Sequence, residues 1–285
     1  MPPVKSLGNS RAKYNYKFGL TGLEAALPAP GLVYSDDVFS TYLYEGINNS
    51  LTIPNDIDLA SKGGIIWDKD RDNVRDSRIV DVQSNALLST SLPNSKLNGS
   101  VDISSYITYN SNGWTSPNDS SGQNTNGNSH VSWTFRKQPG FFTIKNWTGD
   151  GQGDRYLDHD LESVPGFVMV KNLTDSQDWG CYHRSLGTLI RNGLTLNESY
   201  ESGNSNIINP IRTTPTASQI HIRGAANEYN TLNKKYVAYI FAHDDQRFGT
   251  DKDESIIKCG DFTAHASGVS VDIGWEPQFV MWKTA

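Results

Sequence analysis

Apolar and polar residues alternate with a period of two in the stretches richest in aromatic and β-branched side chains. The clearest are VFSTYLYEG at 38–46 and HVSWTFRK at 130–137, where Val131, Trp133 and Phe135 occupy every second position. Alternate residues of a β-strand point to the same face of its sheet, so this pattern predicts strands with one apolar face. Clusters of Asn, Ser, Asp and Gly separate the stretches, as turns do. The pattern therefore predicts an all-β protein built from many short strands.

One pattern of turn and strand occurs three times along the chain. It reads DLASKGGIIWDK at 58–69, DLESVPGFVMVK at 160–171 and DIGWEPQFVMWK at 272–283. Each copy has Asp first, Gly or Pro in the middle, three apolar residues and Lys last, which is typical of a turn that leads into a strand. We expect the aspartates to cap the turn and the lysines to end the strand at the solvent.

A second repetition follows the same order. Residues 113–135 align without a gap on residues 219–241, so that Val131 matches Val237 and Phe135 matches Phe241. Two patterns that recur in the same order, each about a hundred residues later, indicate consecutive copies of one structural unit.

These repeats predict tandem β-sandwich units at 38–138 and 139–249. Residues 250–285 either start a third unit or close the second one, with strands expected at 256–262 and 279–282. Strands shared between neighbouring units would leave no free sheet edge between them. The repeats do not decide between two separate sandwiches and one fused body.

Residues 1–37 differ from the rest of the chain. Tyr14, Tyr16 and Phe18 alternate with lysines, and LPAPG follows at 27–31, where proline prevents a regular ladder. We expect an extended arm that docks on a partner through these three rings. The alternative is a disordered leader, because chain ends are loose unless a contact holds them.

Composition and charge narrow the class of protein. The chain has 285 residues, of which 36% are apolar, and a formal net charge of -6. It can therefore bury a sizeable core, and it lacks the basic footprint expected of a nucleic-acid-binding protein. No apolar run is long enough to predict insertion into a membrane. Cys181 and Cys259 are too few for a disulfide scaffold, and we expect free thiols.

Two acidic clusters have the spacing of possible cation ligands. Asp68, Asp70 and Asp72 alternate, and the GDGQGD stretch contributes Asp150 and Asp154. The calcium loop of a helix-loop-helix site carries a turn glycine and a distal glutamate, and the first cluster has Asn and Ile at those positions. We interpret both clusters as polar turns and expect neither a metal nor a cofactor.

Two groupings resemble catalytic sites. Cys181 and His183 fall on one face of a predicted strand, as a nucleophile and its base could. No third residue is placed to orient the histidine, so a packed row is the better interpretation. A glycosidase needs two carboxylates that face each other across a cleft. The acidic residues here fall in turns, and we expect their side chains at the protein surface. We therefore predict that the protein is not an enzyme.

Tryptophans near turns are candidates for stacking on a sugar ring. Trp147 and Trp275 are in such places and are therefore our candidates for contact with a glycan of a host surface. Trp133 lies within a strand and aligns with Tyr239, so we expect it in the core.

Four linked phrases give the chain a family resemblance from about Phe39 onward. They are SWTFRKQP at 132–139, VPGFVMVK at 164–171, DWGCYHRSLG at 178–187 and YVAYIFAHDD at 236–245. Together they resemble a repeat family common in virion structural proteins of cyanobacterial and other marine phages. The first unit departs from it, because DRDNVRDSRIVD at 70–81 stands where the second unit has its Trp and Tyr-His phrase.

The resemblance implies a concanavalin-like or jelly-roll-like β-sandwich in a tail fibre or another appendage. The arm at 1–37 would anchor the chain to other virion proteins of the tail, the baseplate or the region near the portal. The repeats would project towards the host, in a homo-oligomer for which a trimer is the usual fibre arrangement. The protein would be assembled in the host cytoplasm and end up in the virion.

Three alternatives remain open from the sequence. The first is a carbohydrate-binding adhesin or receptor-binding module that acts on a host-surface glycan. The second is a decoration protein of the capsid or neck. The third is a depolymerising tailspike glycosidase.

Overall fold

The computed structural model describes residues 31–119, 122–224 and 229–285. Antiparallel sheets dominate this part of the chain, and its helices are single short turns. The prediction of an all-β, sandwich-type fold is therefore confirmed. None of the helices in the described ranges is long and apolar enough to cross a membrane.

The first unit contains one large and one small antiparallel sheet. The large sheet has the order β1 (Phe39–Glu45), β8 (Ser129–Arg136), β3 (Gly64–Asp70), β4 (Arg78–Asp81) and β5 (Ala86–Ser89). The small sheet has the order β2 (Leu51–Pro54), β7 (Gly113–Ser116) and β6 (Thr108–Asn110). The short helices are α2 (Ser35–Val38), α3 (Leu59–Lys62) and η1 (Ile103–Ser105).

The second unit repeats this topology. Its large sheet has the order β9 (Phe142–Thr148), β15 (Lys235–Phe241), β11 (Phe167–Asn172), β12 (Gly180–His183) and β13 (Leu194–Thr195). Its small sheet pairs β10 (Arg155–Asp158) with β14 (Gln219–Ile222), and η2 (Arg184–Leu186) follows β12. Each strand of the large sheet has a counterpart at the same place in the first unit, so the repeat seen in the sequence is also a repeat of topology. The unit boundaries at 138 and 249 stay a prediction.

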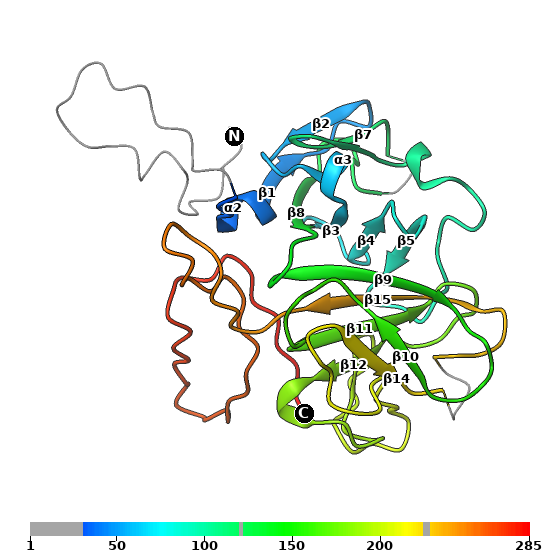
Figure 1. Cartoon of the computed structure of the whole chain (residues 1–285). Coiled ribbons are helices and arrows are strands. Elements are labelled where there is room, and N and C mark those ends of the chain that lie inside the picture. Colours follow the sequence, from blue (N-terminus) through cyan, green and yellow to red (C-terminus); the bar gives the residue numbers. More distant parts are fainter. Residues whose placement is uncertain (1–30, 120–121, 225–228) are drawn as a thin grey trace.

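The two large sheets pack face to face and share one core, as the stacked arrows in Figure 1 show. This core takes Trp67 and Phe135 from the first unit and Met169, Trp179 and Tyr239 from the second. Each small sheet covers the opposite face of its own large sheet through a separate cluster. The described strands therefore form four layers, with the small sheets outside.

This layering explains why several strands are not amphipathic. Both faces of a large sheet are covered, so a polar residue on either face would need a buried partner. In β15 every residue from Tyr236 to Phe241 is buried, and in β5 all four residues are. In β8, Phe135 faces the shared core with Trp133 packed against it, as the alternation predicts, whereas Thr134 on the other face accepts a hydrogen bond from Asn55.

Polar contacts also join the two units. Three side chains of the second unit donate hydrogen bonds to the first. Tyr239 Oη lies 3.1 Å from Asp81 Oδ2, Trp179 Nε1 lies 2.8 Å from the Ser89 carbonyl oxygen, and Lys171 Nζ lies 2.9 Å from the Pro93 carbonyl oxygen. The junction is therefore both apolar and directional, which fixes one sheet against the other.

The C-terminal segment differs from the prediction. Residues 256–262 and 279–282 form no strand, so the prediction of two strands there is wrong. The third copy of the repeated pattern lacks the neighbours that β3 and β11 have on both sides. Phe279 instead packs at the rim of the shared core against four rings of the first unit, Phe39, Trp67, Trp133 and Phe135. Trp282, three positions further on, is 75% exposed.

Replacing Tyr239 with Phe should destabilise the junction. The change removes a donor from Asp81, which is fully buried, and an under-satisfied buried acceptor costs about 1–3 kcal/mol. Urea unfolding should therefore show a lower midpoint. Tyr156→Phe is the control, because Tyr156 is exposed and its hydroxyl makes no hydrogen bond within the described ranges, so its effect should stay within about 0.5 kcal/mol. Equal midpoints for the two variants would contradict a role for this bond.

Candidate functional site

The repeated lysines serve the fold rather than a site at the surface. Lys69 and Lys171 each donate to a backbone carbonyl six residues further along, that of Arg75 and that of Gln177. Lys171 is fully buried, and Lys283 donates to the carbonyl oxygen of Glu198. For Lys171 the prediction of a strand end at the solvent is wrong, because this lysine is fully buried and the turn that follows β11 supplies a carbonyl to its ammonium group. Lys69 and Lys283 are half-buried.

The repeated aspartates differ among the three copies. Asp58 accepts from the backbone N–H of Ser61 at the start of α3, and Asp272 accepts from the backbone N–H of Gly274. Both therefore cap a turn, as predicted. Asp160 instead accepts from the hydroxyl of Thr143 and forms an ion pair with Lys137.

The acidic clusters are occupied by protein donors. Asp70 accepts from the backbone N–H groups of Asp72 and Asn73, and from the Asn128 amide at 2.8 Å. In the GDGQGD stretch, Asp150 accepts from Asn230 and lies 3.5 Å from Arg155. Within the ranges that the structure describes, no group of three or more His, Cys, Asp or Glu residues is arranged to hold a metal ion.

Asp68 belongs to a buried polar group with Tyr44 and His130. Its carboxylate accepts from Tyr44 Oη at 2.5 Å and lies 3.4 Å from His130 Nδ1. Burial raises the pKa of Asp68, because a charged carboxylate is poorly solvated there. Asp68 and His130 are both buried, so this group lies in the interior of the first unit.

Trp147 is the counterpart of Tyr44 in the second unit. It stacks on Tyr236 with ring centroids 5.2 Å apart, as Tyr44 does on His130. It is buried, and its indole N–H donates to the carbonyl oxygen of Tyr229 at 2.9 Å. The prediction of a glycan contact at Trp147 is therefore wrong, because both its ring and its polar atom are already used inside the fold.

The other predicted contacts have different outcomes. Trp275 is 36% exposed, and Lys258 Nζ lies 5.9 Å from the centre of its ring. A glycan contact at Trp275 stays a prediction. Tyr14, Tyr16 and Phe18 lie outside the described residues.

The cysteines are not placed as nucleophiles. Cys181 is buried in the shared core beside Trp179, and burial raises the pKa of its thiol to about 12. Burial raises the pKa of Cys259 to about 12 as well. His183 lies at the edge of the core, where Nδ1 accepts from the backbone N–H of Ser185. At neutral pH both thiols stay protonated, so neither is the reactive thiolate.

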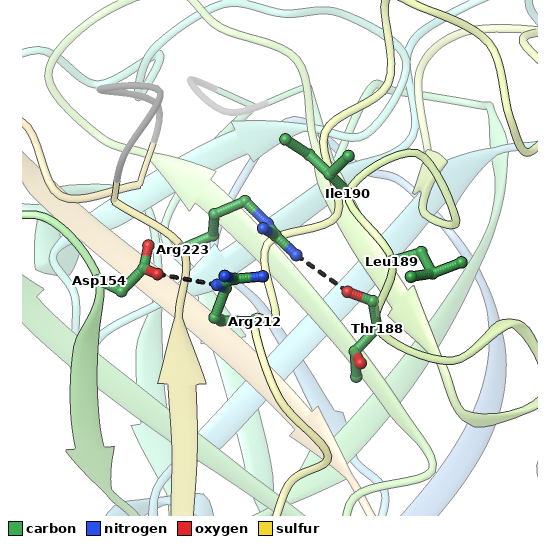
Figure 2. Close-up of a pocket in the computed structure, with 6 residues that line it drawn as sticks. All are labelled: Asp154, Thr188, Leu189, Ile190, Arg212 and Arg223. Atoms are coloured by element: carbon green, nitrogen blue, oxygen red, sulfur yellow. Dashed lines mark hydrogen bonds and ion pairs between the residues drawn. The ribbon is translucent and has the colours of Figure 1, made fainter.

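A pocket of about 440 Å³ lies at one end of the small sheet of the second unit (Figure 2). Asp154 directly precedes β10 and Arg223 directly follows β14, and Arg155 pairs with Ile222, so the strand register brings these two side chains together. Ile211 bridges to Ile222 as well, which places Arg212 beside the same strand end. The pocket is lined by Asp154, Thr188, Leu189, Ile190, Arg212 and Arg223.

The polar wall of the pocket carries two guanidinium groups and one carboxylate. Arg223 is 5% exposed, and its Nε and Nη2 atoms donate to the carbonyl oxygens of Asn209, Thr188 and Ile211 at 2.9–3.3 Å. Arg212 Nε donates to Asp154 Oδ2 at 3.0 Å. Burial, followed by the nearby Arg212, lowers the pKa of Arg223. Arginine nevertheless stays charged at neutral pH, so this wall is positive.

The opposite wall is apolar and open to solvent. Leu189 and Ile190 come from the loop after η2, and Leu189 is 70% exposed. Beside the pocket, Tyr156 stacks on His221 with ring centroids 3.9 Å apart and is 61% exposed. A positive wall, an apolar wall and an exposed ring pair thus lie close together on one unit.

Because Lys171 is buried, we expect the free energy of unfolding to depend on pH. Burial lowers its pKa to about 8, whereas an unfolded chain holds that proton up to a pH of about 10.4. Between these values the unfolded state binds more protons, so Lys171 makes the free energy of unfolding rise with pH. In Lys171→Met that rise should disappear, and stability should fall by about 1–3 kcal/mol because two carbonyls lose their donor.

Urea unfolding between pH 8 and pH 10 measures this difference. Lys69→Met, at the equivalent position of the first unit, leaves Lys171 and therefore the rise in place. Parallel pH profiles of Lys171→Met and the wild type would contradict the assignment.

The sequence was compared with protein families, with curated proteins and with solved structures, and one family matches. Searches of the curated proteins and of the solved structures found no match. A family model described as a domain of unknown function, DUF7483, matches residues 34–285. This match covers both large sheets, the pocket and the C-terminal segment, and the chain therefore belongs to the DUF7483 family.

Proposed function

We propose that the protein is a structural component of a phage virion, within a tail fibre or another appendage. The observation that carries the proposal is the repeated large sheet, present twice with the same strand order and joined through one core. Arrays of repeated units build elongated structures because each unit buries a face of its neighbour. The phrases that resemble repeats of virion proteins lie on β8, β11, β12 and β15 of these two sheets and on the turns next to those strands.

The junction between the units suits a rigid spacer. Tyr239, Trp179 and Lys171 each donate across it, so the sheets are held in register by directional bonds as well as by apolar packing. Inter-domain contacts that are large and hydrophobic restrict relative motion. An appendage that transmits position from the particle to its tip needs such stiffness.

Attachment and assembly extend the proposal. Residues 1–37 anchor the chain to other proteins of the tail, the baseplate or the region near the portal. Copies of the chain associate in a homo-oligomer, with a trimer expected for a fibre. A decoration protein of the capsid or neck is the variant that uses the same repeats at another place on the particle.

Imaging of purified particles tests the location. Antibody raised against residues 38–285 should label an appendage at a constant position on every particle, and antibody absorbed with the purified chain should label none. Light scattering of the purified chain should give the mass of an oligomer. Particles free of the chain, together with a monomer in solution, would overturn the proposal.

A further inference from the structure

We propose that the pocket formed by Asp154, Leu189, Ile190, Arg212 and Arg223 binds a carboxylated sugar of an acidic polysaccharide. This inference does not depend on the location of the protein. It starts from the charge of the pocket, whose described lining residues include two arginines and one aspartate, with Arg212 paired to Asp154.

Among the residues that the structure describes, Arg223 is a buried cation that bonds to no carboxylate. Its hydrogen bonds go to three backbone carbonyls, which are neutral, and its Nη1 atom has no acceptor in the part of the chain that the structure describes. Arg212 uses Nε for Asp154, and its two terminal nitrogens have no acceptor among the described residues. These nitrogens can therefore donate to a ligand oxygen, and the carbonyls already hold Arg223 in place.

The donor set favours a carboxylate that belongs to a sugar. Planar guanidinium groups match the two oxygens of a carboxylate, whereas the carboxylate of Asp154, bonded to Arg212, repels a doubly charged group such as a phosphate monoester. Asp154 itself is held by the protein, since its Oδ1 accepts from the backbone N–H of Gly224 at 2.9 Å and its Oδ2 accepts from Arg212 Nε at 3.0 Å. The pocket thus offers guanidinium donors for an anion, and its carboxylate limits the charge of the anion that fits.

The apolar wall of the pocket fits the apolar face of a sugar ring. The face of a sugar ring presents C–H groups, and Leu189 and Ile190 offer exposed apolar surface opposite the arginines (Figure 2). A volume of about 440 Å³ lies within the usual range of small-ligand sites. Tyr156, stacked on His221, presents an exposed ring close by, on which the next sugar of a polymer can stack.

The negative net charge of the chain restricts where an acidic polymer can bind. The net charge is -6, so an acidic polymer is repelled by the molecule as a whole and attracted only where positive groups gather. Binding should therefore depend on the arginines of the pocket.

Calorimetric titration of the full chain with polygalacturonate tests the proposal, with dextran sulfate and neutral dextran as the other two probes. We expect saturable binding of polygalacturonate, weaker binding of dextran sulfate and none of dextran. Arg212→Gln should weaken binding of polygalacturonate at least tenfold, and Leu189→Ser should weaken it as well.

The matched control is Arg155→Gln. Arg155 is a neighbouring arginine on β10 that pairs with Asp150 and does not line the pocket. This variant should bind as the wild type does, and thermal unfolding should show that all variants are folded. Three results would overturn the proposal: no binding of polygalacturonate, equal losses in Arg155→Gln and Arg212→Gln, or dextran sulfate as the better ligand.

Discussion

The packing of one large sheet on the other is the constraint on which the rest of the structure depends. Because the shared core covers the inner face of each sheet and a small sheet covers the outer face, the central strands of both large sheets are removed from water. Every polar group that enters these layers then needs a partner inside the protein. The repeated lysines and the caps of the turns provide such partners. They occur in both units because the large sheet of each unit is covered on both faces.

The same constraint explains the chemistry of the buried groups. Burial raises the pKa of Asp81, and of Tyr239 well above its ordinary value, and the two are joined across the junction. In the first unit, Tyr44, Asp68 and His130 occupy the places that Trp147, Val170 and Tyr236 take in the second. One architecture therefore tolerates either a polar or an apolar filling at the same layer, provided that the polar members bond to one another.

The strands and the repeat could be predicted from the sequence because they depend on local alternation. Trp133 and Phe135 face one core, as their spacing indicates. Trp147 could not be placed, because its position near a turn does not reveal that its ring stacks on Tyr236 and that its indole N–H bonds to the carbonyl oxygen of Tyr229. The pocket could not be predicted either, since the pairing of β10 with β14 brings Asp154 to Arg223, and the separate bridge of Ile211 to Ile222 brings Arg212 there. The prediction of strands at 256–262 and 279–282 was wrong because an apolar stretch forms a strand only where another strand pairs with it, and local alternation does not reveal whether such a partner exists.

The order of strands in each large sheet has a consequence for folding. The last strand of each unit, β8 or β15, lies between the first strand and the third rather than at an edge. The centre of a sheet therefore cannot close until the ribosome has made nearly the whole unit, and contacts between distant residues slow folding. Until then β1 and β3, or β9 and β11, have unpaired edges at which other chains can add. The step that inserts β8 or β15 is thus where the nascent chain most needs protection from aggregation.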